Sequence, residues 1–307
     1  MPTILITTDY LRPSDEVDTY LTGLGFATRH DPMRGTRSES SLAAALDGAE
    51  GALIANEPMT AQVLGQARSL RAIVRTGVGY DSVDVIAAAE LGISVSNLPG
   101  INANAVAEYT IALMLAQARS LVSTAAGVAG GEWPRRDGFE LRGRTLGIIG
   151  RGAVAQTVRP LAEAFGMSVL DGDLDKLLRE SDFVSVHTAL NEHTRHLIDA
   201  SALAKMKPTA HLINTARGPI VDSAALAAAV RSGQIAGAAL DVVDIEPLPM
   251  DSELRDVDGI TVYSHMAGQT AEARRNAGIE GAHELVAALA GAPNHLVPGS
   301  ARPGRKP

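Results

Sequence analysis

The sequence predicts an α/β protein with two domains, each built on a parallel sheet that helices cover on both faces. At 307 residues the chain is too long for one ordinary domain and is comfortable for two. Short apolar runs alternate with amphipathic helical segments, which is typical of parallel sheets. Hydrophobic residues make up 46% of the chain but aromatic residues only 3%, so the core is expected to consist mainly of Val, Ile, Leu and Ala.

The alternation can be followed from the N-terminus. Residues 3–8 are predicted to form a buried strand, and a helix is expected after Ser14. Apolar strands and helices then alternate through residues 51–97. The turn formed by residues 97–100, Asn-Leu-Pro-Gly, ends this first series, and a second series begins at Thr145.

Two helical segments indicate how the domains are connected. An Ala-rich helix is expected over roughly 102–129, directly after the first series. Residues 270–290 also read as a helix, and we expect this helix to return to the first domain. The predicted domains are therefore a discontinuous one, 1–97 with 271–307, and a continuous one, 98–270.

The composition excludes several classes of function. A net charge of −8 argues against nucleic-acid binding, and the chain contains no Cys for disulfides or thiolate metal sites. The i,i+3 spacing of His193 and His196 could suggest a metal site, but no carboxylate or Cys cluster joins them, so no metal is expected. No signal peptide or membrane-length apolar run is apparent, and the cytoplasm is the default expectation.

A strand–loop–helix motif at the start of the second series predicts a phosphate-binding turn. Residues 144–150 form an apolar strand that runs into Gly150-Arg151-Gly152-Ala153-Val154-Ala155, and a helix follows. Gly150 permits the tight turn, Gly152 lets a pyrophosphate approach the backbone, and Ala155 allows close packing of helix and strand. The free N–H groups of the helix N-terminus favour the anion. These features indicate a Rossmann-like dinucleotide site.

An acidic residue after the next strand supports this interpretation. Asp173 follows Gly152 at roughly the 20-residue separation that is typical of an acid binding the adenosine ribose. Asp171 is the competing candidate. A carboxylate here would repel a 2′-phosphate, so NAD is preferred to NADP.

Three further strands of the second series end in groups suited to acid–base chemistry. Arg217 follows the apolar run 211–214 and could hold a carboxylate. Glu246 follows residues 237–243, and His265 follows residues 260–264. The carboxyl ends of parallel strands meet at one edge of a sheet, where such proteins bind ligands. A histidine oriented by a carboxylate beside a nicotinamide could donate a proton to a keto oxygen while hydride reaches the carbon.

Taken together, these motifs resemble the D-isomer-specific 2-hydroxyacid dehydrogenase family, which includes phosphoglycerate dehydrogenases and glyoxylate or hydroxypyruvate reductases. The resemblance covers nearly the whole chain. Its segments are residues 75–81 (RTGVGYD), 97–108 (NLPGINANAVAE), 141–150 (LRGRTLGIIG), 214–218 (NTARG), 240–247 (LDVVDIEP) and 265–268 (HMAG).

The resemblance implies specific roles for these residues. Arg217, Glu246 and His265 match the catalytic Arg, Glu and His of the family. The backbone around Gly77, Val78 and Gly79 would bind the substrate carboxylate together with Arg217. Asp241 would contact the nicotinamide amide. The remaining cofactor contacts would come from Val106, Gly150, Arg151, Gly152, Ala153, Val154, Asp173, Thr215, Ala216, His265 and Gly268. The resemblance also implies a homodimer formed through the helical arm at 102–129.

The chain departs from the family pattern on the adenosine side. Family members carry about one more helix and one more strand between the positions of Met167 and Ser181. The sequence therefore predicts a nucleotide domain that is shortened after its second strand. The predicted function is an NAD-dependent oxidoreductase that moves a hydride to or from the α carbon of a small 2-hydroxy or 2-keto acid. The alternative is a catalytically impaired member that acts as a binding or regulatory protein.

Overall fold

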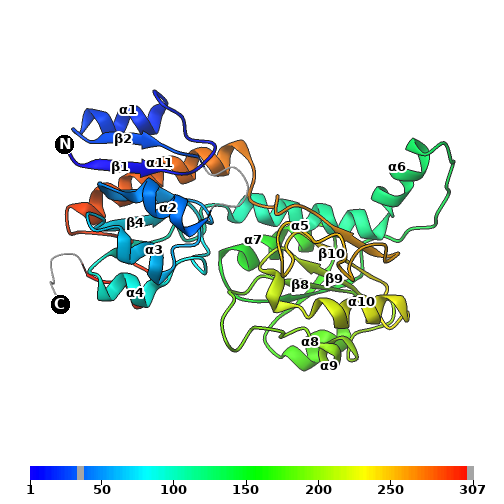
Figure 1. Cartoon of the computed structure of the whole chain (residues 1–307). Helices are drawn as coiled ribbons and strands as arrows, with labels where there is room; N and C mark the ends of the chain where they lie inside the picture. The colour runs from blue at the N-terminus through cyan, green and yellow to red at the C-terminus, as the bar shows by residue number, and fades with distance from the viewer. Residues whose placement is uncertain (33–37, 303–307) are drawn as a thin grey trace. The chain divides into compact units, whose positions relative to one another are not determined.

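The computed structural model describes residues 1–32 and 38–302, and these residues group into two compact units. Unit 1 consists of Met1–Asn102 and Thr270–Pro307, and unit 2 is Ala103–Gln269. Residues 303–307, which belong to the predicted first domain, lie outside the described part of the chain. Each unit has one sheet, and every strand pair in both sheets is parallel (Figure 1). This confirms the predicted fold class.

Unit 1 has a five-stranded sheet in the order β2-β1-β3-β4-β5. The strands are β1 (Thr3–Ile6), β2 (Ala27–His30), β3 (Ala49–Ile54), β4 (Ala72–Arg75) and β5 (Ser94–Ser96). The helices are α1 (Glu16–Gly23), α2 (Glu39–Leu46), α3 (Ala61–Gln66), α4 (Val85–Glu90) and α11 (Ala271–Leu289).

Two apolar layers cover the faces of this sheet. Residues of α2, α3 and α4, including Leu42, Val63 and Ala88, pack on one face. Residues of α1 and α11, including Leu21 and Leu285, pack on the other. The helix expected near 270–290 is therefore present as α11, and it supplies part of the first core although it comes last in the sequence.

Unit 2 has a six-stranded sheet in the order β11-β10-β9-β8-β6-β7. The strands are β6 (Thr145–Ile149), β7 (Ser168–Leu170), β8 (Phe183–Val186), β9 (His211–Asn214), β10 (Gly237–Leu240) and β11 (Ile260–Val262). The helices are α5 (Ala103–Ala118), α6 (Leu121–Ala129), α7 (Ala153–Ala164), α8 (Leu174–Glu180), α9 (Ala200–Leu203) and α10 (Ser223–Arg231), with a short 3₁₀ turn, η1 (Gly218–Ile220).

The sheet of unit 2 also has a core on each face. Helices α5 and α7 pack on one face through residues such as Met114 and Val158. Helices α8, α9 and α10 pack on the other through residues such as Leu178, Leu203 and Leu226. The chain leaves β6 toward β7 on one side and resumes at β8 on the other. Ligands bind parallel sheets at such a switch point, beyond the carboxyl ends of the strands.

Strand β7 lies at the edge of this sheet, where β6 is its one partner among the described strands. After β7 the chain enters α8 at once and crosses back to β8. No further strand or helix lies between β7 and α8 in the described part of the chain, as expected for a nucleotide domain that is shortened after its second strand.

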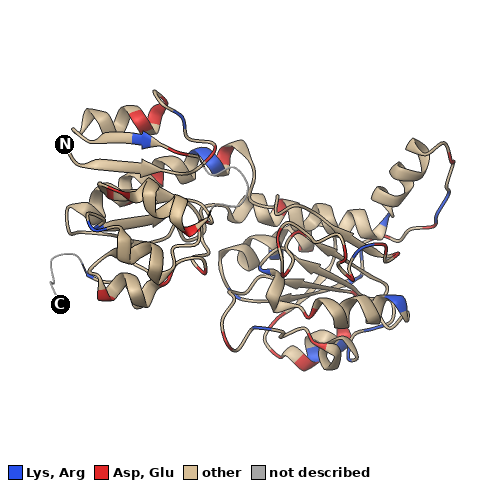
Figure 2. Ribbon diagram, in the orientation of Figure 1, with Lys and Arg blue, Asp and Glu red and all other residues tan. Residues whose placement is uncertain are grey.

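The prediction of one continuous helix over 102–129 is wrong. The structure contains two helices, α5 and α6, that meet at an angle of 65°. Ser120, at the junction, adopts a left-handed backbone with φ of 49°. Helix α6 buries none of its residues and extends away from the rest of unit 2 as an uncharged arm (Figures 1 and 2).

Among the described residues, no single helix is long and apolar enough to cross a membrane. The bent pair α5 and α6 reaches the required length and composition only when the two helices are taken together.

Candidate active site

The turn after β6 is shaped for close approach of a phosphate. Gly150 has φ of 121°, and a Cβ at this position would lie 2.2 Å from the carbonyl oxygen of His187. Only glycine fits there. Gly152 is the N-cap of α7, and a Cβ at this position would meet no atom within 4 Å. The first glycine is therefore required by the fold, whereas the second leaves open space in front of the helix.

The N-terminus of α7 lacks the side-chain cap that its neighbours have. Helices α8, α9 and α10 each follow an aspartate, Asp173, Asp199 or Asp222, whose carboxylate accepts a backbone N–H of the first turn. Gly152 offers no such acceptor. The N–H groups at Ala153 and Val154 therefore remain available, and a pyrophosphate is a suitable acceptor for them.

The two acids predicted as candidates for binding the adenosine ribose, Asp171 and Asp173, directly follow β7. The Asp171 carboxylate forms an ion pair with Arg159 of α7. The Asp173 carboxylate accepts the N–H of Lys176 at 3.1 Å and so caps α8. Because α8 begins directly after Asp173, one of its oxygens is used by the helix. The Arg151 guanidinium lies beside Gly172, between the two acids in sequence.

The turn after β9 is held by the side chain of Asn214. Its amide nitrogen donates to the Arg217 carbonyl at 2.9 Å, and its amide oxygen accepts the Ala216 N–H at 3.0 Å. The Arg217 guanidinium donates to the Ala216 carbonyl at 2.8 Å. Thr215 and Ala216 thus lie in a fixed turn whose last residue is the predicted substrate-binding Arg217.

Glu246 and His265, the two residues that the sequence predicted for acid–base chemistry, lie in direct contact. Nδ1 of His265 lies 2.8 Å from Oε2 of Glu246, and Oε1 of Glu246 accepts the Val243 N–H at 3.2 Å. Burial would raise the pKa of Glu246, but the His265 hydrogen bond and charge, the Val243 N–H and the Arg217 charge together lower it from its usual value. Glu246 is therefore anionic near neutral pH.

Asp241, the residue after β10, is almost completely buried. Its two carboxylate oxygens accept the backbone N–H groups of Met266 and Ala267. Gly268 continues the same turn. The resemblance assigned Asp241 to the nicotinamide amide, but its carboxylate is already hydrogen-bonded within the protein.

A buried polar chain links the phosphate turn to the turn of Arg217. His187, after β8, lies 2.8 Å from the Ser185 hydroxyl through Nε2 and 3.4 Å from the Thr215 hydroxyl through Nδ1. The Thr215 hydroxyl in turn lies 3.3 Å from that of Thr110 on α5. Burial lowers the pKa of His187 to about 4, so this ring is neutral at pH 7.

These buried hydrogen-bonded side chains were not predicted from the sequence, because single polar residues in apolar strands give no periodic signal. The one available sign was the position of His187 at the end of a strand. Val106 of α5, a predicted cofactor contact, is buried one helical turn before Thr110.

The remaining predicted site residues, Gly77, Val78 and Gly79, lie in unit 1 directly after β4. The Gly77 carbonyl accepts the Leu98 N–H at 2.9 Å, and the Val78 carbonyl accepts the Asn97 side-chain amide at 2.6 Å. A Cβ on Gly77 would clash with the Arg75 guanidinium, 1.6 Å away. The local hydrogen bonds use the carbonyl groups at Gly77 and Val78, and Gly77 also donates its N–H to the Arg75 carbonyl at 2.7 Å.

Unit 2 thus places an uncapped helix N-terminus, an arginine and a carboxylate–histidine pair after four strands of one parallel sheet. The first suits a dinucleotide, and the others suit proton transfer on a carboxylated substrate. Fold and site together define a dinucleotide-dependent oxidoreductase.

Comparisons with known proteins give the family. Residues 111–172 and 170–267 match the D-isomer specific 2-hydroxyacid dehydrogenase, NAD binding domain, in two segments that meet at the end of β7. A hydroxypyruvate reductase of Thermotoga maritima is 40% identical over 241 residues, covering 72% of this chain and 78% of the relative. A glyoxylate reductase of Thermofilum pendens is 35% identical over 288 residues, covering 86% and 82%. The chain belongs to the D-isomer-specific 2-hydroxyacid dehydrogenase family and is an NAD-dependent oxidoreductase.

Solved structures agree with this assignment. The TT0316 protein of Thermus thermophilus superposes with a TM-score of 0.88 at 33% identity, covering 96% of this chain and 99% of the other. A glyoxylate reductase from Paecilomyes thermophila gives 0.86 at 28% identity, with coverage of 97% and 98%.

Proposed function

We propose that the protein interconverts a small D-2-hydroxy acid and its 2-keto acid, with His265 as the acid–base group. The observation that carries this proposal is the 2.8 Å contact between His265 and Glu246 at the same sheet edge as the phosphate turn. Glu246 holds Nδ1, which leaves Nε2 of the imidazole to exchange a proton with the substrate oxygen.

The residues present fit a nicotinamide dinucleotide. The uncapped N-terminus of α7 and the space in front of Gly152 suit a pyrophosphate. Asp173 keeps one carboxylate oxygen for a ribose hydroxyl, and the acid would disfavour a 2′-phosphate, so we propose NAD(H) ahead of NADP(H). Thr215, Ala216 and Gly268 would face the nicotinamide end. When bound, the reduced cofactor supplies the hydride.

The protein's own groups then manage charge and proton. In the direction of reduction, His265 donates its Nε2 proton to the keto oxygen as that oxygen gains negative charge. Glu246 stabilises the imidazolium beforehand and keeps the ring in one orientation. In the direction of oxidation, the neutral imidazole accepts the hydroxyl proton.

Recognition of the substrate carboxylate is proposed for two groups. Arg217 offers a fork of donors suited to a carboxylate or to the adjacent carbonyl. The backbone amides of Val78 and Gly79 would bind the carboxylate, whereas the Gly77 N–H already donates to the Arg75 carbonyl. Because two relatives described above are named hydroxypyruvate and glyoxylate reductases, we propose substrates with a short substituent on the keto carbon.

The decisive experiment is a titration of the purified protein with NADH and, separately, NADPH, followed by cofactor fluorescence, and then a panel of 2-keto acids. We expect NADH to bind more tightly than NADPH. We expect His265→Ala to reduce kcat by roughly 10²- to 10⁴-fold, and Arg217→Ala to act mainly on KM. Normal turnover by His265→Ala would refute the assignment of the proton donor. Failure of both cofactors to bind at millimolar concentration would favour the regulatory alternative, with which the shortened sheet is also compatible.

We also propose that the protein is a homodimer through the arm formed by α5 and α6. Helix α6 buries none of its residues, and its apolar side chains include Leu121, Val122 and Val128 at 53%, 44% and 46% exposure. An uncharged, projecting helix of this kind gains stability when a second copy covers it.

A further inference from the structure

Arg151 is an exposed arginine at the first variable position of the phosphate turn. It lies between Gly150, which the fold requires, and Gly152, which is the N-cap of α7. The Arg151 backbone carbonyl accepts the side-chain amide of Gln156 in α7 at 3.2 Å. The backbone from which this side chain extends is therefore held by the neighbouring strand and helix.

The Arg151 side chain reaches the turn that follows β7. Strands β6 and β7 are parallel neighbours with Gly147 opposite Leu170, so their carboxyl ends lie side by side at one edge of the sheet. A Cβ built on Gly172 would lie 3.5 Å from Nη2 of Arg151. Because this position is glycine, with φ of 93°, no side chain comes between the guanidinium and the backbone of the turn. The cation therefore lies where a Rossmann-like site holds the adenosine ribose.

The two acids that flank Gly172 are bound to groups other than Arg151. The Asp171 carboxylate forms an ion pair with Arg159 of α7. Oδ1 of Asp173 accepts a backbone N–H in the first turn of α8 at 3.1 Å. Among the described residues, neither acid forms an ion pair with Arg151, so the guanidinium is not used to neutralise the carboxylates beside it.

The chemistry of a guanidinium favours a phosphate at this place. Its fork of donors matches the oxygens of a phosphate group, and hydrogen bonds between charged groups are among the stronger ones in proteins. NADP(H) differs from NAD(H) by one phosphate on the 2′ oxygen of the adenosine ribose, and an arginine near the ribose acid can accommodate that phosphate. The charge of Asp173 repels the same group, so Arg151 and Asp173 act on it in opposite directions.

We propose that Arg151 is a specificity-determining residue: it binds the 2′-phosphate of the adenosine ribose and so lets the protein accept NADP(H) as well as NAD(H). This inference rests on the proposed dinucleotide site at the phosphate turn. The preference for NAD(H) that Asp173 provides is then smaller than the acid alone would give. The residue responsible lies in the phosphate turn, not among the residues after β7 that carry the ribose acid.

The test measures the dissociation constants of NADH and NADPH for the wild-type protein and for Arg151→Ala, by cofactor fluorescence. The decisive quantity is the ratio of the NADPH constant to the NADH constant, because a general disturbance of the phosphate turn weakens both cofactors alike. We expect this ratio to rise roughly 10-fold in Arg151→Ala, as for the loss of a hydrogen bond between charged groups. Arg151→Lys, which keeps the charge but loses the fork, should show a smaller rise. An unchanged ratio in Arg151→Ala would overturn the inference.

The matched control is Arg179→Ala. Arg179 is an exposed arginine in the last turn of α8, at the other end of this helix from Asp173, and it pairs with Asp175. Its loss changes the net charge by the same amount as Arg151→Ala. The ratio should stay within about twofold of the wild-type value, because salt screens exposed charges at a distance. A rise equal to that of Arg151→Ala would show that net charge determines the preference, and it would overturn the inference.

A further variant, Asp173→Asn, tests the opposing residue. The amide keeps a side-chain oxygen that can cap α8 but removes the negative charge. We expect the ratio of the two dissociation constants to fall roughly threefold, opposite in sign to the effect of Arg151→Ala. A rise of the ratio in Asp173→Asn would contradict the opposing action of the two residues and overturn the inference.

Turnover distinguishes this inference from the proposed function. If the wild-type protein reduces a 2-keto acid with NADH and Arg151→Ala leaves the ratio unchanged, the inference alone fails. If the ratio changes as expected but neither cofactor supports the reduction of any 2-keto acid, the proposed function fails and the role of Arg151 in cofactor binding stands.

Discussion

We expect the aromatic cluster around His211 of β9 to make the protein less stable in mild acid. His211 is 7% exposed, and its ring stacks on Phe183 with centroids 5.3 Å apart. Phe139 packs at 5.6 Å from the same ring. Burial lowers the pKa of His211 to about 4, although a backbone hydrogen bond at Thr209 acts in the opposite direction. The imidazole is therefore neutral in the folded protein well below pH 6.

The sign and size of the effect follow from the two pKa values of this histidine. In the unfolded chain His211 titrates near its ordinary value of about 6.5. Between pH 7 and about 4 the unfolded state therefore binds a proton that the folded state does not, so stability falls as the pH falls. With a folded pKa of about 4, the loss from pH 7 to pH 5 is about 2 kcal/mol in the free energy of unfolding.

The perturbation that isolates this contribution is His211→Phe, which keeps an aromatic ring between Phe139 and Phe183. Urea unfolding followed by circular dichroism at pH 7 and pH 5 would give the free energy of unfolding for wild type and variant. The drop between the two pH values should be about 2 kcal/mol smaller in the variant. His187 contributes equally to both proteins and cancels in the comparison.

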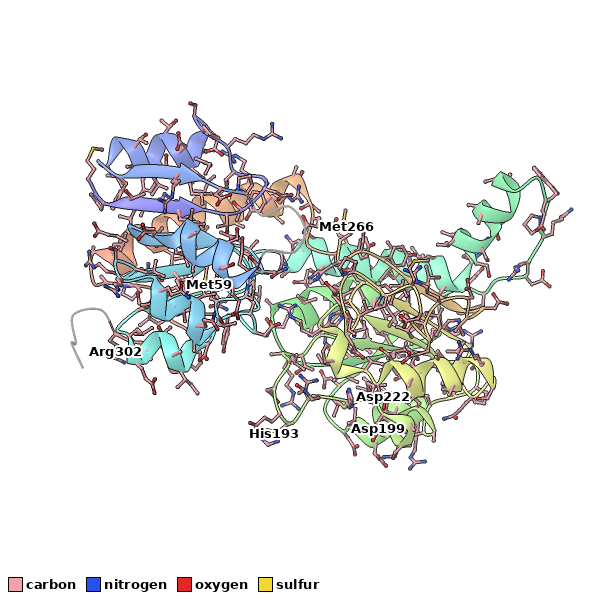
Figure 3. The ribbon with its side chains drawn as sticks, in the orientation of Figure 1. Met59, His193, Asp199, Asp222, Met266 and Arg302 are labelled. Atoms are coloured by element: carbon pink, nitrogen blue, oxygen red, sulfur yellow. The ribbon has the colours of Figure 1, made fainter. Side chains whose placement is uncertain are left out.

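The control is His193→Phe, because His193 is an exposed residue of unit 2 (Figure 3). It should show the wild-type drop. If His211→Phe lost as much stability as wild type between pH 7 and pH 5, the histidine would titrate as in solution, and the interpretation of its burial would be refuted.

Two further predictions concern the phosphate turn and the arm. Gly150→Ala should lower both the melting temperature and NADH affinity, because its Cβ would meet the His187 carbonyl at 2.2 Å. Gly152→Ala should weaken NADH binding at an unchanged melting temperature, since its Cβ meets only open space; equal effects of the two substitutions by thermal melting would contradict this distinction. Val122→Glu with Val128→Glu should shift the sedimentation coefficient from dimer to monomer, and a wild-type protein that sediments as a monomer would exclude the proposed interface.

Most of the fold could be predicted from the sequence because buried parallel strands appear in it as short apolar runs. The runs that became β3, β4 and β6 are flanked by helical segments and turn residues, so their alternation identified both sheets. β2 was missed. Its residues, Ala-Thr-Arg-His, are all partly exposed at the edge of the sheet and have neither an apolar run nor a clear alternation. Edge strands of this kind are specified by their neighbours more than by their own composition.

The break between α5 and α6 could not be predicted, because the local sequence favours a helix throughout the segment. The segment is Ala-rich and contains no Gly or Pro at the junction, so local propensity favours one continuous helix. The left-handed backbone of Ser120 arises where the chain leaves the core of unit 2, and no residue pattern encodes the loss of packing.

In the site, too, residues within motifs could be predicted, whereas contacts that depend on the tertiary structure could not. Glycine spacing and strand ends identified the phosphate turn and the residues Arg217, Glu246 and His265. The hydrogen bonds of Asp241 could not be inferred, because they join two loops that are separated in sequence and depend on the backbone of His265. Similarly, capping of α8 by Asp173 follows from the missing strand and helix, which bring the next helix directly to this acid.

The discontinuity of unit 1 also sets an order of events during synthesis. Helix α11 covers one face of the first sheet, where Leu285 packs with Leu53 and Val74, yet it is made after all of unit 2. At about 5–20 residues per second, a ribosome needs roughly 10 to 35 s to travel from β5 to α11. By the end of this interval unit 2 has every residue that its own core requires, whereas one face of the first sheet is covered by α1 alone and lacks the part of its core that α11 supplies. The nascent chain is therefore expected to fold its second unit first and to depend on chaperones until the last helix emerges.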